Sequence, residues 1–192
     1  MKIKISADST CDLSPELIAR YNIGITPLYI VRGDETLRDG IDVHPEELYA
    51  YAKDTGKLCQ TAAVNVSDYY AYFSAARAEY DAVIHFTISS DMSGCYQNAC
   101  IAAREFTNVY PVDARNLSTG IGHLVLDAAD MAAQGMDAAD IAAALEKKRE
   151  KLDVSFVLDT LQYMWKGGRC SGVTALGANL LPGDELLSPV GA

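Results

Sequence analysis

The segment DAVIHFTIS, residues 81–89, most narrows the choice of fold, because it is a continuous apolar run with the length of one strand. A strand that is apolar at nearly every position is buried on both faces, which is typical of a parallel sheet covered by helices. Strand-like segments alternate with helical patterns along the chain; the other expected strands are KIKISAD, NIGITPLYIV, NVYPVDA and VSFVLDT. This alternation predicts an α/β protein whose first domain is a three-layer structure built on a parallel sheet.

Signals for helix starts and a change in amino-acid composition divide the chain further. Ser14 and Pro15 mark the start of a first helix, and Ser67 is the expected N-cap of a long helix over SDYYAYFSAARAEY. From about residue 161 glycines mix with helix formers, and the final PGDELLSPVGA has little periodic pattern. We therefore expect an N-terminal α/β domain over residues 1–160 and the start of a partial second α/β domain over residues 161–192.

Charge and hydropathy exclude two classes of partner. The chain has 26 acidic and 16 basic residues, and its net charge of -10 repels nucleic acid and anionic membrane surfaces. No apolar run approaches the roughly 20 residues of a membrane span, and the start MKIKISADST lacks the apolar core of a signal peptide. We expect no nucleic-acid partner, no stable membrane insertion and a cytoplasmic location.

The cysteines and histidines do not indicate a metal or a disulfide framework. The five cysteines are an odd number without a CxxC pair, and no histidine stands at ligand spacing from them. They are expected to be buried, reduced thiols that pack as small apolar residues. We assign no metal and no cofactor.

Polar loops follow several of the expected strands, where open parallel sheets bind their ligands. Asp8 and Ser9 follow the first strand, Thr61 and Asn65 lie in a loop that opens a helix, and the loop Ser89–Gly94 follows the apolar strand. A helix N-terminus offers free N–H groups and partial positive charge, so it holds a carboxylate or phosphate without a basic side chain. Ser93 and Gly94 form such a candidate anion seat, although a serine before a helix is also a common N-cap.

Two other motifs keep alternatives open. Gly167, Gly168 and Arg169 could build a turn against a phosphate or carboxylate, or could simply end a helix. Asp8 stands where some phosphohydrolases carry a nucleophile, but Thr10 replaces the second acid that they need. No GxSxG elbow or P-loop occurs, so no catalytic residue is assigned. A small hydrolase using Asp8 or Ser93 is the alternative function.

Six motifs together resemble the DegV family in order and spacing, over residues 1 to about 180: ISADSTCDL, LRDGIDV, the Thr61 loop, ISSDMSGCYQNA, PVDARNLSTGIG and LDTLQYMWKGGR. The resemblance implies a non-catalytic protein that binds one long-chain fatty acid in an apolar slot between two domains. It also implies that Thr61, Ser93 and the backbone of Gly94 hold the carboxylate, with Asn65 assisting. The implied partner is a fatty acid kinase catalytic subunit, which phosphorylates the presented carboxylate to an acyl phosphate. Burial of the acyl chain would supply about 0.8 kcal/mol per CH2.

The chain also departs from the family pattern. Ala62 stands where the family usually has serine, and Cys95 replaces a usual threonine. These two replacements predict fewer local hydrogen bonds than in the family pattern. The family continues for about a further third of its length, and its C-terminal half-domain, with a histidine near the carboxylate, has no counterpart here. A truncated remnant that folds but binds nothing is therefore a further hypothesis.

Overall fold

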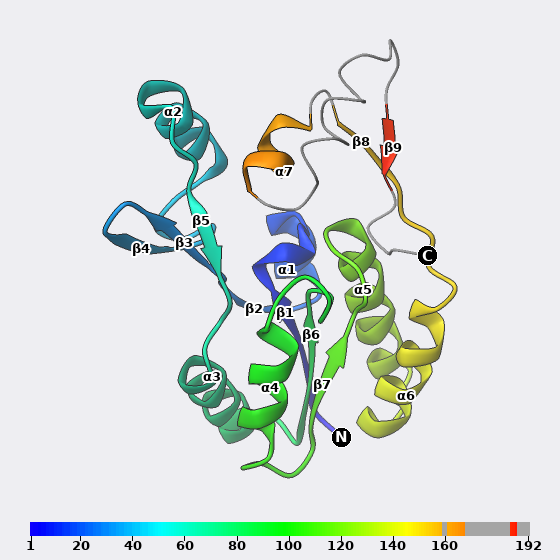
Figure 1. The fold of residues 1–192 in the computed structure, drawn as a ribbon. Helices are drawn as coiled ribbons and strands as arrows, with labels where there is room; N and C mark the ends of the chain where they lie inside the picture. The colour runs from blue at the N-terminus through cyan, green and yellow to red at the C-terminus, as the bar shows by residue number, and fades with distance from the viewer. Residues whose placement is uncertain (159–160, 168–184, 188–192) are drawn as a thin grey trace. The chain divides into compact units, whose positions relative to one another are not determined.

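The computed structural model describes residues 1–158, 161–167 and 185–187 (Figure 1). Its backbone divides into two compact units, the first made of Met1–Leu28 and Ala63–Asp153 and the second of Tyr29–Ala62 and Val154–Ala192. This division is discontinuous along the chain, whereas the sequence led us to expect one boundary near residue 160. The domain pair 1–160 and 161–192 stays a prediction.

The first unit is built on a parallel sheet with the strand order β2-β1-β6-β7. The strands are β1 (Ile3–Asp8), β2 (Gly24–Thr26), β6 (Ala82–Thr87) and β7 (Val109–Asp113). Ile5 of β1 lies opposite Ile84 of β6, and Phe86 lies opposite Val112 of β7. All six residues of β6 are buried, as the apolar run predicted.

Helices cover both faces of this sheet (Figure 1). The first unit contains the turn η1 (Ser9–Cys11) and the helices α1 (Pro15–Arg20), α3 (Val66–Glu79), α4 (Cys95–Ala103), α5 (Thr119–Ala133) and α6 (Ala138–Arg149). Ile84 and Phe86 pack with α5 and α6, whereas Val83 packs with Phe73 of α3 and Ala99 of α4. The alternating faces of β6 thus serve two cores, and the expected three-layer α/β fold is confirmed.

The connections leave the centre of the sheet in opposite directions. Ile18 of α1, which links β1 to β2, packs against the core that includes α5 and α6. The helix α4, which links β6 to β7, packs on the opposite face. The neighbouring strands β1 and β6 therefore flank a topological switch point, and ligands of such sheets bind beyond the carboxyl ends of those strands.

The described part of the second unit contains two small antiparallel sheets. One has the order β4-β3-β5 and the other pairs β8 with β9. Its elements are β3 (Tyr29–Arg32), β4 (Glu35–Arg38), α2 (Pro45–Thr55), β5 (Gln60–Ala62), β8 (Phe156–Leu158), α7 (Gln162–Lys166) and β9 (Glu185–Leu187). One expectation is corrected here: the expected strand VSFVLDT contains β8, which pairs with β9 instead of extending the parallel sheet.

Helix starts agree only in part with the sequence. Ser14 caps α1 as expected, because its hydroxyl accepts a hydrogen bond from the Leu17 N–H at 3.4 Å. The expected cap Ser67 is wrong: Asn65 caps α3, and its side-chain oxygen accepts from the Asp68 N–H at 2.9 Å. In the part of the chain that the structure describes, no helix combines the length and apolarity needed to cross a bilayer.

Candidate functional site

Asp8 ends β1 at the switch point, and its carboxylate is completely buried. Oδ1 accepts hydrogen bonds from Tyr69 Oη at 2.7 Å and Thr26 Oγ1 at 3.0 Å, and His85 Nε2 lies 3.2 Å away. Oδ2 accepts from the Ile88 N–H at 3.1 Å. Both carboxylate oxygens are therefore engaged within the protein, with three contacts at Oδ1 and one at Oδ2. This geometry makes Asp8 a structural acceptor and does not favour its use as a nucleophile.

His85 is a satisfied core histidine within the apolar strand β6. Its Nδ1 lies 2.9 Å from Ser6 Oγ, and its ring packs edge-on against Tyr69 and Phe73. Burial, followed by the negative charge of Asp8, raises the pKa of Tyr69 above its ordinary value, so this hydroxyl remains a proton donor to Asp8. The hydroxyls of Tyr69 and Thr26 and the ring of His85 therefore hold the Asp8 carboxylate in one orientation.

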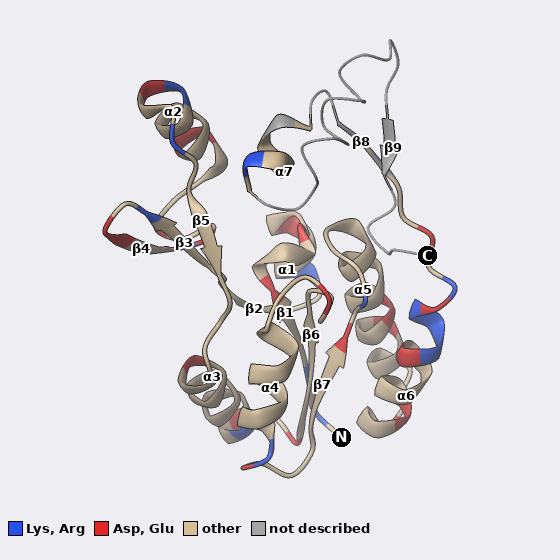
Figure 2. Cartoon of the chain, in the orientation of Figure 1, with Lys and Arg blue, Asp and Glu red and all other residues tan. Residues whose placement is uncertain are grey.

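The loop between β6 and α4 begins with three N–H groups that donate to other parts of the first unit. Ile88 donates to Asp8 Oδ2, Ser89 donates to the Asn116 carbonyl oxygen at 3.0 Å, and Ser90 donates to Asp113 Oδ1 at 3.1 Å. Asp113 ends β7, whose carboxyl end has the acidic colour in Figure 2. The start of the loop is thus fixed to both strands that neighbour β6.

The later N–H groups of the loop find acceptors within the loop, with one exception. Ser89 accepts the N–H groups of Met92 and Ser93 at its carbonyl oxygen and that of Asp91 at its hydroxyl. The Cys95 N–H donates to Ser93 Oγ at 3.3 Å. Among the residues that the structure describes, no acceptor is found for the Gly94 N–H. This donor is available at the first turn of α4, where the helix dipole favours an anion.

Nothing in the protein itself requires glycine at position 94. Its φ of -75° suits any residue, and a Cβ atom added there would meet no atom within 4 Å. Gly94 is exposed, so the side of the loop next to its N–H is open. The residue type therefore leaves room for a ligand to approach the backbone.

Ser93 can add a second donor to this position. Its hydroxyl donates to Cys95 Sγ at 3.2 Å, and because sulfur is a weak acceptor, the proton can turn toward a better one. Burial, with the charge of Asp8 as the second cause, raises the pKa of the Cys95 thiol. Cys95 is therefore a buried, protonated thiol, as the sequence suggested, and not a reactive thiolate.

Two further predicted residues lie in the same unit as this loop. Asn65 caps α3, and the carbonyl of the preceding Val64 accepts a hydrogen bond from Asn98 Nδ2 of α4 at 2.8 Å. Asn65 is therefore held close to the helix that Ser93 and Gly94 begin. Ser9 follows β1, and its hydroxyl accepts from the Leu28 N–H at 3.2 Å, where the chain leaves the unit.

The remaining predicted residues belong to the second unit or are not described. Thr61 lies in the middle of β5, opposite Ile30 of β3, and is exposed. Gly167 follows α7, and its N–H donates to the Tyr163 carbonyl oxygen at 2.9 Å, so it ends that helix. Gly168 and Arg169 lie outside the described residues.

Sequence reasoning missed the contribution of the loop after β7. Asp113 and Asn116 accept N–H groups of the β6–α4 loop, and Arg115 binds Asp91 at 2.7 Å and Ser90 Oγ at 3.2 Å. A signal was present, because PVD ends in an aspartate at the carboxyl end of an expected strand, as ISAD does.

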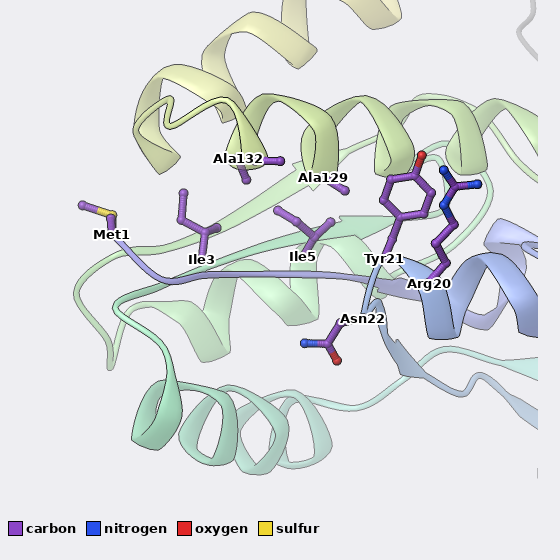
Figure 3. Close-up of a pocket in the computed structure, with 9 residues that line it drawn as sticks. Met1, Ile3, Ile5, Arg20, Tyr21, Asn22, Ala129 and Ala132 are labelled. Atoms are coloured by element: carbon purple, nitrogen blue, oxygen red, sulfur yellow. The ribbon is translucent and has the colours of Figure 1, made fainter.

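A surface pocket of about 340 Å³ lies near the amino end of β1 (Figure 3). Ile3 and Ile5 of β1 face Ala129 and Ala132 of α5 across it, with Tyr21 nearby. It is open because β2 pairs only with Ser6–Asp8 of β1. The pocket contains none of the predicted site residues, and we assign no function to it.

Comparisons with known proteins cover nearly the whole chain. A family model described as "Uncharacterised protein, DegV family" matches residues 2–182. A DegV domain-containing protein of Clostridium perfringens is 32% identical over 187 residues, which are 94% of this chain and 67% of the relative. The solved structure of a DegV family protein from Thermus thermophilus, described as showing fatty acid binding, has a TM-score of 0.87 at 30% identity, covering 98% of this chain and 68% of that one.

A more distant structure shares the fold. The Fatty Acid Kinase (Fak) B3 protein of Streptococcus pneumoniae, solved with linoleic acid, has a TM-score of 0.83 at 22% identity, covering 98% of this chain and 69% of that one. The chain thus spans about two thirds of the length of the proteins it matches.

Proposed function

Because this chain belongs to the DegV family, we propose that it binds one long-chain fatty acid and holds the carboxylate at the loop before α4. The relative from Thermus thermophilus, which is 30% identical in sequence to this chain, is described as binding fatty acid. The observation that carries the proposal to particular residues is the Gly94 N–H, which finds no acceptor in the described part of the chain while its neighbours in the loop do.

The chemistry of this loop suits a carboxylate. One ligand oxygen would accept from the Gly94 N–H and the Ser93 hydroxyl, and such charge-assisted bonds are about twice as strong as neutral ones. We keep Thr61 and Asn65 in the proposed ligand set, because both are exposed polar residues. Supporting roles are proposed for Asp8, Ser9, Gly167, Gly168 and Arg169.

We further propose that a fatty acid kinase catalytic subunit acts on the bound ligand in the cytoplasm. The kinase would transfer a phosphoryl group to the carboxylate to form an acyl phosphate, and this chain would supply no catalytic residue. Two observations support a binding role: protein donors occupy the Asp8 carboxylate, and burial keeps Cys95 protonated. The free thiols of Cys11, Cys59, Cys95 and Cys100 suit a reducing compartment.

Ligand content is the direct test of fatty acid binding. The purified protein is denatured and extracted with organic solvent, and the extract is analysed by mass spectrometry for a stoichiometric fatty acid. The delipidated protein is then titrated with oleate and with oleyl alcohol, which has the same chain without a carboxylate. We expect oleate to bind more tightly than the alcohol. Equal binding of the two, or no binding of either, would refute the carboxylate seat.

The partner is tested separately. A fatty acid kinase catalytic subunit is incubated with ATP, magnesium and oleate, with and without this chain, and acyl phosphate is trapped with hydroxylamine as a hydroxamate. Hydroxamate formed only in the presence of this chain supports presentation of the ligand. If the chain binds oleate but no hydroxamate forms, the kinase partnership is wrong and the binding function stands.

A further inference from the structure

The loop after β6 is held by the two strands that flank β6 in the sheet. β1 and β7 pair with β6 on its two sides, and each ends in a buried aspartate, Asp8 at 0% exposure and Asp113 at 5%. Asp8 accepts the Ile88 N–H and Asp113 accepts the Ser90 N–H, both at 3.1 Å. Two carboxylates from different strands therefore fix residues two positions apart in the loop.

Charge alone does not explain these residues beside a carboxylate seat. Buried carboxylates cost desolvation free energy, and their negative charge repels an anionic ligand at the same loop. Asp113 is compensated by the Arg115 N–H at 2.9 Å and by the Arg115 guanidinium at 4.0 Å. Asp8 receives its compensation from neutral hydroxyls, the loop N–H and His85. The two carboxylates therefore oppose anion binding electrostatically. Any favourable contribution they make must come from the geometry of the hydrogen-bond donors.

We propose that Asp8 and Asp113 are positioning residues for the ligand carboxylate, an inference that rests on the proposed function. By accepting the N–H groups of Ile88 and Ser90 they fix the path of the loop toward α4. The Gly94 N–H then has a set direction before the ligand arrives. Donors ordered in advance bind without the entropic cost of ordering the loop.

The substitutions Asp8→Asn and Asp113→Ala test this role. At position 8, asparagine keeps the size of aspartate but replaces one acceptor oxygen with an NH2 group that cannot accept a hydrogen bond. Alanine is needed at position 113, because the Ser90 and Arg115 N–H groups both donate to Oδ1, which an asparagine oxygen could replace. Loss of negative charge would strengthen oleate binding, whereas loss of loop positioning would weaken it, so the two explanations predict opposite signs. We expect about tenfold weaker oleate binding in each variant, which corresponds to one lost hydrogen bond, with oleyl alcohol affinity unchanged.

Two control variants separate positioning from stability and from charge. Thr26→Val removes a donor to Asp8 Oδ1 but leaves the bond between Asp8 and Ile88, so it damages the buried network without releasing the loop. Asp12→Asn removes an exposed carboxylate near Asp8 in sequence, at a φ of 48° that asparagine tolerates. Both controls should keep the oleate preference of the wild type.

Amide hydrogen exchange, followed by NMR, provides a readout that does not depend on the ligand. The Ile88 amide should exchange faster in Asp8→Asn, and the Ser90 amide should exchange faster in Asp113→Ala, relative to global unfolding. Unchanged or tighter oleate binding by both variants would overturn the positioning role. A loss of oleate affinity in Thr26→Val equal to that in the aspartate variants would also overturn it. In either case, the preference of the wild type for oleate over oleyl alcohol still upholds the proposed function. Failure of the wild type to bind oleate overturns both.

Discussion

Replacing Gly94 with proline removes the single backbone donor on which the proposed seat depends. The φ of -75° lies within the range of proline, and the lost N–H has no acceptor in the described residues, so the fold loses no hydrogen bond. Proline stabilises by about 0.4–1 kcal/mol through the unfolded chain, while its ring restricts the preceding Ser93. We expect the free energy of unfolding to change by less than about 1 kcal/mol.

The same substitution should weaken carboxylate binding strongly. A hydrogen bond to a charged group contributes about 1.5–3 kcal/mol, so the Kd for oleate should rise about 10- to 100-fold. The affinity for oleyl alcohol, which offers only a neutral acceptor, should fall less. Both ligands are titrated calorimetrically, and urea unfolding of the same samples reports whether the fold is retained.

Gly94→Ala is the matched control, because alanine keeps the N–H and its methyl group meets no protein atom within 4 Å. The alanine variant should therefore bind oleate more tightly than the proline variant, by most of the 10- to 100-fold rise in Kd expected for proline. Oleate affinity of the folded proline variant equal to that of the wild type would show that the Gly94 N–H does not contact the ligand.

Three other perturbations have defined outcomes. Ser93→Ala should weaken oleate binding about tenfold in the same titration, and its loss of the Cys95 N–H bond should cost about 1 kcal/mol of stability; unchanged oleate affinity would exclude the hydroxyl from the seat. Gly120→Ala would place a Cβ atom in steric overlap with Asn116 Oδ1, so urea unfolding should show a loss of about 1–3 kcal/mol. Hydrogen bonds from Arg38 lower the pKa of Asp42 from 3.8 to about 2, so its stabilising contribution is present above pH 3.8 and is lost as the pH falls through about 2. NMR titration should give that midpoint, and Arg38→Ala should move it upward.

The elements of the first unit were predictable because their signals are local. β6 is apolar at nearly every position and is buried at all of them. The stripe of Cys95, Ala99 and Ala102 on α4 packs in one core as its spacing indicates. His85 lies within that strand and finds its partners there, so its structural role followed from its surroundings.

Pairing partners were not predictable, because they depend on contacts far apart in sequence. The segment VSFVLDT has the pattern of the other strands, yet β8 pairs antiparallel with β9. The choice between Asn65 and Ser67 as the cap of α3 is equally unresolved by residue type, since both cap helices well. The bond from the Asp68 N–H to Asn65 decides it.

The residues of the candidate site also fall into a predictable and an unpredictable group. Ser93 and Gly94 could be found from their position between a buried strand and a helix. Asp113 could be noticed as the last residue of an expected strand, but its role could not be predicted, because that role depends on the register that sets it opposite Thr87, at the start of the loop it holds. A sequence pattern names residues at strand ends, but only the sheet order shows which loop each end can reach.

The pairing of Tyr29 with Ala62 has a consequence for how this chain can change. The Cα atoms of paired antiparallel residues lie about 4.5–5.5 Å apart. The chain leaves the first unit after Leu28 and returns to it at Ala63, so Tyr29 and Ala62, the first and last residues of the segment between, lie side by side. Residues 29–62 are therefore a cassette that a linker of two or three residues could replace. Such an exchange would leave the parallel sheet, the Asp8 network and the Gly94 loop intact, while it removed Thr61. Evolution and protein engineering can thus alter one group of proposed ligand contacts without rebuilding the other.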